Sequence, residues 1–184
     1  SCSISFQKRE KGLKHQIKMP KIQGPEKLKS DLELRKDLKS KIPKDYLPMW
    51  LREREIETRQ VEPVDLLKAE KLPPYRSTWM KPTGKLPSDE RIHQALLLYV
   101  SDMGLLGAAV NPHEVNFMSK KFQSASLDHV MWFHGKVNFN NWVLHHMHSP
   151  ISQNARGFSR GSIYTKAGKL IASTAQEGLM RIWD

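Results

Sequence analysis

Three polar residues, each set in or beside an apolar stretch, are the features of this sequence best suited to chemistry. Asp102 interrupts the apolar segment 95–110, Ser126 directly precedes another apolar run, and Gln176 lies within a third. A buried carboxylate, hydroxyl or amide costs free energy unless it is paired, so one in each apolar segment needs a reason. A shared site that binds a water molecule is one such reason.

Asp102 taken alone has a plain structural interpretation. Ser101 and Asp102 precede Met103, Gly104 and further small and apolar residues, a pattern typical of a helix cap followed by the first turn. Asn111 and the proline after it would end that helix. If Asp102 opens a helix, the backbone N–H groups near Met103 and Gly104 are free to bind an anionic oxygen.

Length and composition predict one packed domain. The chain has 184 residues, of which 39% are hydrophobic and 8% aromatic, which is enough for a well-filled core. No run reaches the roughly 18 to 20 uninterrupted apolar residues of a membrane span, so we predict none. The single cysteine, Cys2, excludes an internal disulfide and a cysteine-built metal site, and it fits a reducing compartment. No signal peptide is visible at Ser1, and we expect the chain to be a piece of a longer protein.

The net charge of +11 is unevenly distributed. Residues 1–50 hold 13 Lys+Arg and 6 Asp+Glu (net +7), and the other 134 residues hold 17 and 13 (net +4). Such a basic segment can attract nucleic acid, an acidic membrane surface or a polyphosphate ligand, but a solvated linker is the interpretation that we favour. The stretch 27–44 contains no aromatic residue on which bases could stack, which disfavours a nucleic-acid module.

The polar residues must be positioned by the surrounding elements. Residues 1–7 alternate between apolar and polar, as in a half-buried strand, and residues 20–50 are charged and proline-punctuated, with a short helix expected around 26–40. Strands are expected at 56–61 and 76–80, while 93–100 fits either strand or helix. Four more strands are expected, at 125–134, 141–148, 156–165 and 170–182, the last two joined by a hairpin turn containing Gly168. Strands, an apolar helix and then four strands predict an α+β fold in which an antiparallel meander closes on one central helix.

Several sequence motifs resemble one known family. They are Ile56-Glu-Thr-Arg-Gln-Val61, Leu86-Pro-Ser-Asp89, Tyr99-Val-Ser-Asp102, Ser126-Leu-Asp-His129, Ala155-Arg-Gly157 and Ala175-Gln-Glu-Gly178. Together they are similar to the C-terminal half of acyl-CoA thioesterase II, the TesB group of double hot-dog thioesterases. The resemblance implies a hot-dog fold with three parts: residues 1–19 as the terminal strand of an otherwise absent first hot-dog domain, 20–54 as a charged linker with a short helix, and 55–184 as the C-terminal thioesterase domain.

The resemblance also implies roles for the three polar residues. Asp102, Ser126 and Gln176 match the family's catalytic positions, where many members have Thr in place of Ser126. A carboxylate can take a proton from an attacking water, and a hydroxyl and an amide can orient that water toward a thioester carbonyl. No cofactor or metal is then needed. Gly104 would allow close approach of an oxyanion, and Arg156 and Arg160 are candidates for the coenzyme A phosphates, with strand-end salt bridges as an equally good alternative.

Other histidines and aromatic residues favour structural roles. The Asp128-His129 pair invites a triad interpretation, but we favour a structural hydrogen-bonded pair. In the run 145–148, His146 and His148 would share one face of a strand while His145 points away, so a metal site is disfavoured. The large aromatic residues are expected in the core rather than along an acyl tunnel; they are Trp79, Trp132, Phe133 and Trp142.

Three functions remain open from the sequence. The first is hydrolysis of fatty acyl-CoA to fatty acid and coenzyme A, with a homo-oligomer and the rest of the first hot-dog domain as expected partners. The second is a non-catalytic hot-dog subunit for acyl binding or assembly. The third, a hot-dog dehydratase, would need an opposed His and carboxylate, and no histidine here stands at a matching position. The compartment is not readable: mitochondrion, peroxisome and cytoplasm all remain, although residues 181–184 do not form a Ser-Lys-Leu-type ending.

Overall fold

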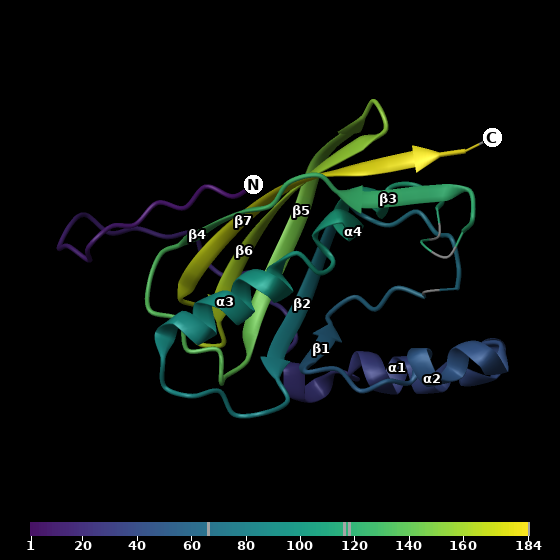
Figure 1. Ribbon diagram of the computed structural model, residues 1–184, viewed down its shortest axis with the longest axis horizontal. Helices are drawn as coiled ribbons and strands as arrows, with labels where there is room; N and C mark the ends of the chain where they lie inside the picture. The colour runs from purple at the N-terminus through teal and green to yellow at the C-terminus, as the bar shows by residue number, and fades with distance from the viewer. Residues whose placement is uncertain (66, 116, 118, 184) are drawn as a thin grey trace.

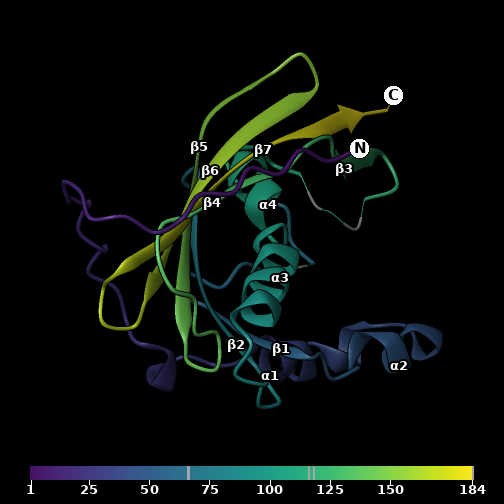
Figure 2. The ribbon, with the colours of Figure 1, turned by 60° about the vertical axis from the view of Figure 1, so that its left-hand side comes forward.

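One antiparallel sheet curls around a central helical segment in the computed structural model, which describes residues 1–65, 67–115, 117 and 119–183 (Figures 1 and 2). The sheet has seven strands in the order β1-β2-β5-β6-β7-β3, and β4 also pairs with β7. The strands are β1 (Ile56–Gln60), β2 (Tyr75–Pro82), β3 (Phe122–Ser126), β4 (Val130–Phe133), β5 (Val143–Gln153), β6 (Arg156–Thr165) and β7 (Leu170–Ile182). The predicted α+β hot-dog arrangement is confirmed.

The β5–β6–β7 meander follows the sequence pattern closely. Along β6, Gly157, Ser159, Gly161 and Ile163 are buried toward the helical side, and the residues between them face the other side of the sheet. Gly168 has φ of +85° in the turn between β6 and β7, a conformation that glycine adopts without strain.

The prediction of one strand over 125–134, next along the meander, is wrong in two respects. This segment lies at the far edge of the sheet, where it pairs with β7, and it is divided into β3 and β4. Ser126 pairs with Gly178 but Val130 pairs with Ala175, so one extra residue is accommodated between them. Such a bulge depends on pairing with a strand 50 residues later, which local alternation does not reveal.

The central segment consists of α3 (Glu90–Ser101) and α4 (Leu105–Val110). The ambiguous run 93–100 is helical because His93, Leu97 and Val100 recur at helical spacing and all face the sheet. Asp89 caps the start of α3, its side chain accepting a hydrogen bond from the Arg91 N–H at 3.0 Å. By length and composition alone the segment Glu90–Val110 could cross a membrane, but 44% of its most apolar window is buried within this fold.

The prediction that Asp102 opens a helix is wrong. Asp102 is the C-cap of α3, and Gly104, with φ of +85°, separates α3 from α4. Glycine is the residue that most readily takes this left-handed conformation at a helix end. Asp102 therefore lies at the break between the two helices.

The segment 20–54, which the sequence predicts to be a linker, contains the short helices η1 (Pro25–Lys27), α1 (Asp31–Asp37), η2 (Lys39–Lys41), η3 (Lys44–Tyr46) and α2 (Leu47–Trp50). The predicted linker helix is confirmed as α1, which begins with a capping box formed by Ser30 and Glu33. It docks on β1 through the Asp31 carboxylate, which accepts hydrogen bonds from Thr58 (2.6 Å) and Gln60 (3.2 Å).

Residues 1–24 form neither helix nor strand, so the strand expected over 1–7 is absent from this structure. Ile4 and Phe6 are 68% and 89% exposed. That this segment ends a first hot-dog domain stays a proposal. Further along, the segment crosses the outer face of the sheet, where Met19, Ile22 and Leu28 cover an apolar cluster of Trp79, Leu144 and Tyr164.

Candidate active site

Asp102, Ser126 and Gln176 meet at one carboxylate oxygen. The Ser126 hydroxyl donates to Asp102 Oδ1 at 2.9 Å, and the Gln176 amide Nε2 donates to the same oxygen. The three side chains come from the end of α3, the end of β3 and the middle of β7, which are far apart in the sequence. A carboxylate, a hydroxyl and an amide around one point have the chemistry of a site that holds and deprotonates a water.

Burial differs among the three residues. Gln176 is only 1% exposed, whereas Asp102 and Ser126 are exposed. The expectation that all three are buried in apolar segments is therefore wrong for two of them. The reason is their position: both lie at the edge of the domain, one at a helix end and one on the last-paired strand.

The bulge between β3 and β4 is fastened to both neighbouring elements. The Asp128 carboxylate accepts a hydrogen bond from the Glu177 N–H of β7 at 2.7 Å, and the His129 ring Nε2 lies 2.8 Å from the Ser101 hydroxyl at the end of α3. Ser101 donates its single proton to the Leu98 carbonyl (2.8 Å), so His129 Nε2 is the donor toward Ser101. Asp128 and His129 are thus structural but do not bond to each other, and burial lowers the pKa of His129 despite the nearby Asp102 and Asp128 carboxylates.

A second layer of polar residues lies beneath the site, on the inner face of the sheet. His145 Nε2 lies 3.1 Å from the Thr174 hydroxyl, two residues before Gln176 on β7. The His145 side chain is fully buried, and burial lowers its pKa to about 3, so the ring is neutral. Sequence reasoning did not identify this contact, because the partners are 29 residues apart and only the strand pairing brings them together.

The remaining predicted site residues are placed less favourably. Arg156 and Arg160 project from the face of β6 opposite to that of Ser159, with Arg156 paired to Glu177 (3.1 Å) and Arg160 over the Phe158 ring (5.3 Å). Gly104 lies between the two helices, beside Asp102. The neighbouring Met103 N–H donates to the Val100 carbonyl at 3.0 Å, so the expectation that it is free is wrong.

The histidines of the run 145–148 face the directions that the sequence predicts, but the predicted burial of the large aromatic residues is only partly correct. His145 points inward and His146 outward, where His146 Nδ1 lies 3.0 Å from the Ser77 hydroxyl. Within the described residues, no group of three metal-ligating side chains occurs. Trp79 is buried as expected, but Trp132 and Phe133 are 51% and 38% exposed, so the core prediction is wrong for these two.

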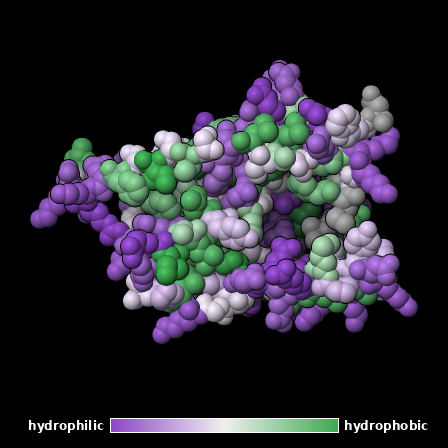
Figure 3. Space-filling model, in the orientation of Figure 1, coloured by the Kyte–Doolittle hydropathy of each residue, from purple (hydrophilic) through white to green (hydrophobic). Residues whose placement is uncertain are grey.

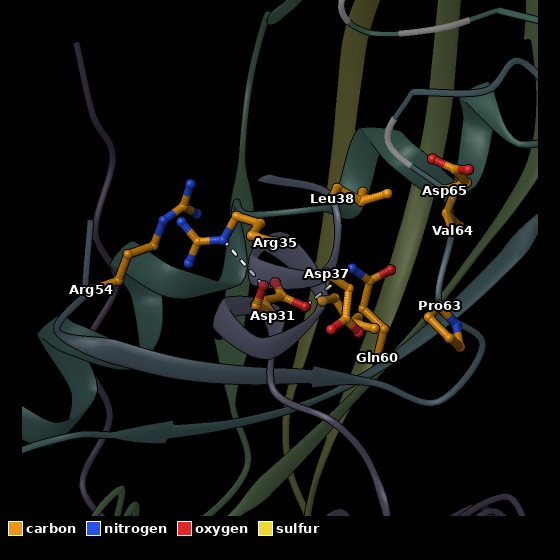
Figure 4. A pocket seen from close by; sticks show the side chains of 10 residues that line it. Asp31, Arg35, Asp37, Leu38, Arg54, Gln60, Pro63, Val64 and Asp65 are labelled. Carbon is orange, nitrogen blue, oxygen red and sulfur yellow. Dashed lines mark hydrogen bonds between the residues drawn. The ribbon is translucent and has the colours of Figure 1, made fainter. Parts of the chain in front are cut away.

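A pocket of about 420 Å³ lies elsewhere, between α1 and the loop after β1 (Figure 4). Its polar groups largely serve the fold: Asp31 holds β1, Asp37 pairs with Lys29, and the Arg35 guanidinium donates to the backbone carbonyls of Asp31 and Trp50. This pocket shares no residue with the Asp102 cluster, and we assign it no chemistry.

Comparison with known proteins now decides the family. The family model for acyl-CoA thioesterases matches residues 50–179. The chain belongs to the acyl-CoA thioesterase family. It is 36% identical over 179 residues to acyl-CoA thioesterase 2 of Haemophilus influenzae, covering 97% of this chain and 63% of that protein.

Solved structures agree with this family assignment. An acyl-CoA thioesterase II, TesB2, from Mycobacterium marinum superposes with a TM-score of 0.69 at 28% identity, over 97% of this chain and 61% of that one. A hot-dog protein from Alicyclobacillus acidocaldarius has a TM-score of 0.65 at 15% identity over 96% of this chain and 60% of that one, which supports the fold alone. The chain spans about three fifths of the length of the curated relatives it matches.

An exposed apolar surface borders the candidate site. Apolar side chains gather over α3 and the neighbouring strand edge (Figure 3). The large exposed apolar residues of α3 are Ile92 (42%), Leu98 (42%) and Tyr99 (65%), and Trp132 of β4 is 51% exposed. Exposed apolar side chains gathered on one element in this way are typical of a surface that another protein domain covers.

Proposed function

We propose that this chain is the catalytic part of an acyl-CoA thioesterase, which hydrolyses fatty acyl-CoA to a fatty acid and coenzyme A. The observation that supports this function is the convergence of Ser126 and Gln176 on Asp102 Oδ1. The relatives named acyl-CoA thioesterases support the same substrate class.

In the proposed reaction Asp102 is the general base. Ser126 and Gln176 hold its Oδ1, which leaves Oδ2 to accept a proton from a water placed against the thioester carbonyl. Attack forms the new C–O bond, and collapse of the tetrahedral intermediate expels the coenzyme A thiolate, which takes up a proton. We propose the Gly104 N–H as a donor to the developing oxyanion, and Arg156 and Arg160 as contacts of the coenzyme A phosphates.

The partner surface fits the same proposal. Asp102 and Ser126 are exposed at the domain edge beside the apolar surface of α3, so we propose that a second hot-dog domain covers them and encloses the acyl chain. That domain would be the remainder of the first one or another copy in an oligomer. No metal or organic cofactor takes part in this mechanism.

The decisive experiment measures thiol release from acyl-CoA of several chain lengths, with the full-length protein and its Asp102→Asn variant. Loss of the general base should lower kcat by about 10²- to 10⁴-fold. The control is Asp37→Asn, a surface substitution in α1 that should leave turnover unchanged. If the wild-type protein cleaves no chain length, the chain is a non-catalytic subunit; if the Asp102→Asn variant equals the wild type, Asp102 is not the base.

A further inference from the structure

Ser159 faces Gln176 directly across two paired strands. The antiparallel register of β6 and β7 places these residues opposite each other, and both are 1% exposed on the inner face of the sheet. Directly opposed residues have Cβ atoms about 4.5 to 5.5 Å apart, which is within reach of a side-chain hydrogen bond or of one bridging water.

The two side chains have complementary unused hydrogen-bonding atoms. Gln176 directs its Nε2 at Asp102, so its Oε1 must point away from the carboxylate. Among the described residues, Gln176 Oε1 and Ser159 Oγ are both buried without a partner. The first is an acceptor that lacks a donor, and the second carries a hydroxyl proton that is not used. Each of these two neighbouring buried atoms would lower the free energy of unfolding if it stayed unpaired.

The sheet is distorted on both sides of this pair. In β5, the register with β6 shifts between His148 and Ile151, opposite Ser159. On the other side, the bulge between Ser126 and Val130 lies opposite Gln176. Bulges are enriched beside active sites, where they redirect side chains. Two bulges in the same row across the sheet single out the row that contains Ser159 and Gln176.

We propose that Ser159 is a positioning residue, whose hydroxyl donates to Gln176 Oε1 directly or through one water and so fixes the orientation of the amide. A primary amide is nearly symmetric in shape and can rotate by 180°. With Oε1 held by a donor, only the NH₂ group can face Asp102. Without that donor the amide can turn Oε1 toward the Asp102 carboxylate. The two oxygens repel each other, and the catalytic water is displaced. This inference rests on the proposed hydrolytic function of Asp102 and Gln176.

The first test compares Ser159→Ala with Ser162→Ala, a serine on the opposite face of the same strand. Because an average hydrogen bond corresponds to about tenfold in rate, Ser159→Ala should lower kcat for acyl-CoA about tenfold with KM nearly unchanged. Its melting temperature should fall by only about 2 to 4 °C, because Gln176 Oε1 loses its donor while the core keeps its packing. Ser162→Ala should match the wild type. An unchanged kcat in Ser159→Ala, or a kcat loss matched by Ser162→Ala, would overturn the proposal.

A double-mutant comparison separates positioning from an independent effect. In a Gln176→Ala background the Ser159→Ala substitution should cause no further loss of kcat, because the amide on which it acts is gone. If the two substitutions instead lower kcat by factors that multiply in full, Ser159 acts on catalysis independently of Gln176. That result would contradict the proposal.

A readout independent of turnover distinguishes this inference from the proposed function. The side-chain NH₂ signals of Gln176 in a ¹H–¹⁵N spectrum, assigned by their loss in Gln176→Ala, should shift in Ser159→Ala and stay unchanged in Ser162→Ala. If the signals shift but the wild-type protein cleaves no thioester, the contact between Ser159 and Gln176 is supported and the proposed enzymatic function is rejected. Unshifted signals in an active enzyme would reject the contact alone.

Discussion

At the scale of single residues, Gly161 allows two polar side chains to meet within the sheet. It lies on β6 between His145 of β5 and Thr174 of β7, and the histidine ring passes over it to reach the threonine hydroxyl. A Cβ at this position would overlap the His145 ring and the Thr174 hydroxyl. The absent side chain is therefore what makes room for the buried contact beneath Gln176.

The substitution Gly161→Ala should destabilise the fold. His145 is fully buried, so its ring cannot swing out into solvent, and overpacking should cost about 1 to 3 kcal/mol. Urea unfolding of the variant measures this cost. Gly84→Ala is the matched control, because a Cβ there meets no atom within 4 Å. Equal midpoints for the two variants would show that the sheet absorbs the methyl group.

The residues of the candidate site were predictable, but their surroundings were not. Asp102, Ser126 and Gln176 stood out as polar residues beside apolar runs and as members of family motifs. Their convergence is visible only in the structure, and so is the exposure of Asp102 and Ser126. Ser159 carried no sequence signal, because one serine in a strand pattern resembles any other until the register places Gln176 opposite it.

At the scale of elements, the bulge between β3 and β4 connects the end of α3 to β7. Ser126 and His129 reach the helix end at Asp102 and Ser101, while Asp128 accepts the Glu177 N–H. The bulge thus helps to fix the distance between Asp102 at the end of α3 and Gln176 on β7.

We expect Asp128→Ala to loosen this connection. Losing the bond to the Glu177 N–H should cost about 0.5 to 1.5 kcal/mol in urea unfolding, and kcat for thioester cleavage should fall with it because Ser126 loses its fixed position. Asp128→Asn keeps an oxygen that accepts the same N–H, so it should stay close to the wild type in both assays. If Asn and Ala at this position behave alike, the negative charge rather than the hydrogen bond is what matters.

Local patterns predicted elements well where both strands of a pair lie close in sequence. The bounds of β6 and β7 and the turn between them followed from alternation and from Gly168. Non-local pairing defeated the same reasoning at 125–134, where contact with β7 divides the segment. Alternation also suggested a strand over residues 1–7, but a strand needs a neighbouring strand, and none pairs with these residues here.

At the scale of the whole molecule, buried histidines make stability depend on pH. Burial lowers the pKa of His145 to about 3, and it also lowers the pKa of His146 and of His129. The unfolded chain protonates these rings near their ordinary pKa of about 6.5. Between the two values the unfolded state binds more protons, so the free energy of unfolding falls as pH falls.

His145 alone should lower the free energy of unfolding by about 2 kcal/mol between pH 6.5 and pH 5, from 1.36 kcal/mol per pH unit. Urea unfolding at several pH values measures this slope. A His145→Asn variant should show a flatter dependence over the same window. Parallel slopes for the variant and the wild type would mean that His145 is protonated in the folded state as well.

The segment that crosses the outer face of the sheet sets a limit on where this domain can be cut. The match to the family model begins at residue 50, yet Trp79 donates its indole N–H to the Gln23 carbonyl at 2.9 Å, and Met19 and Ile22 shield that ring. A truncated protein starting at residue 50 would expose a tryptophan, a leucine and a tyrosine together on a flat sheet surface. Poor solubility of such a truncation would then reflect a misplaced boundary rather than an unstable fold.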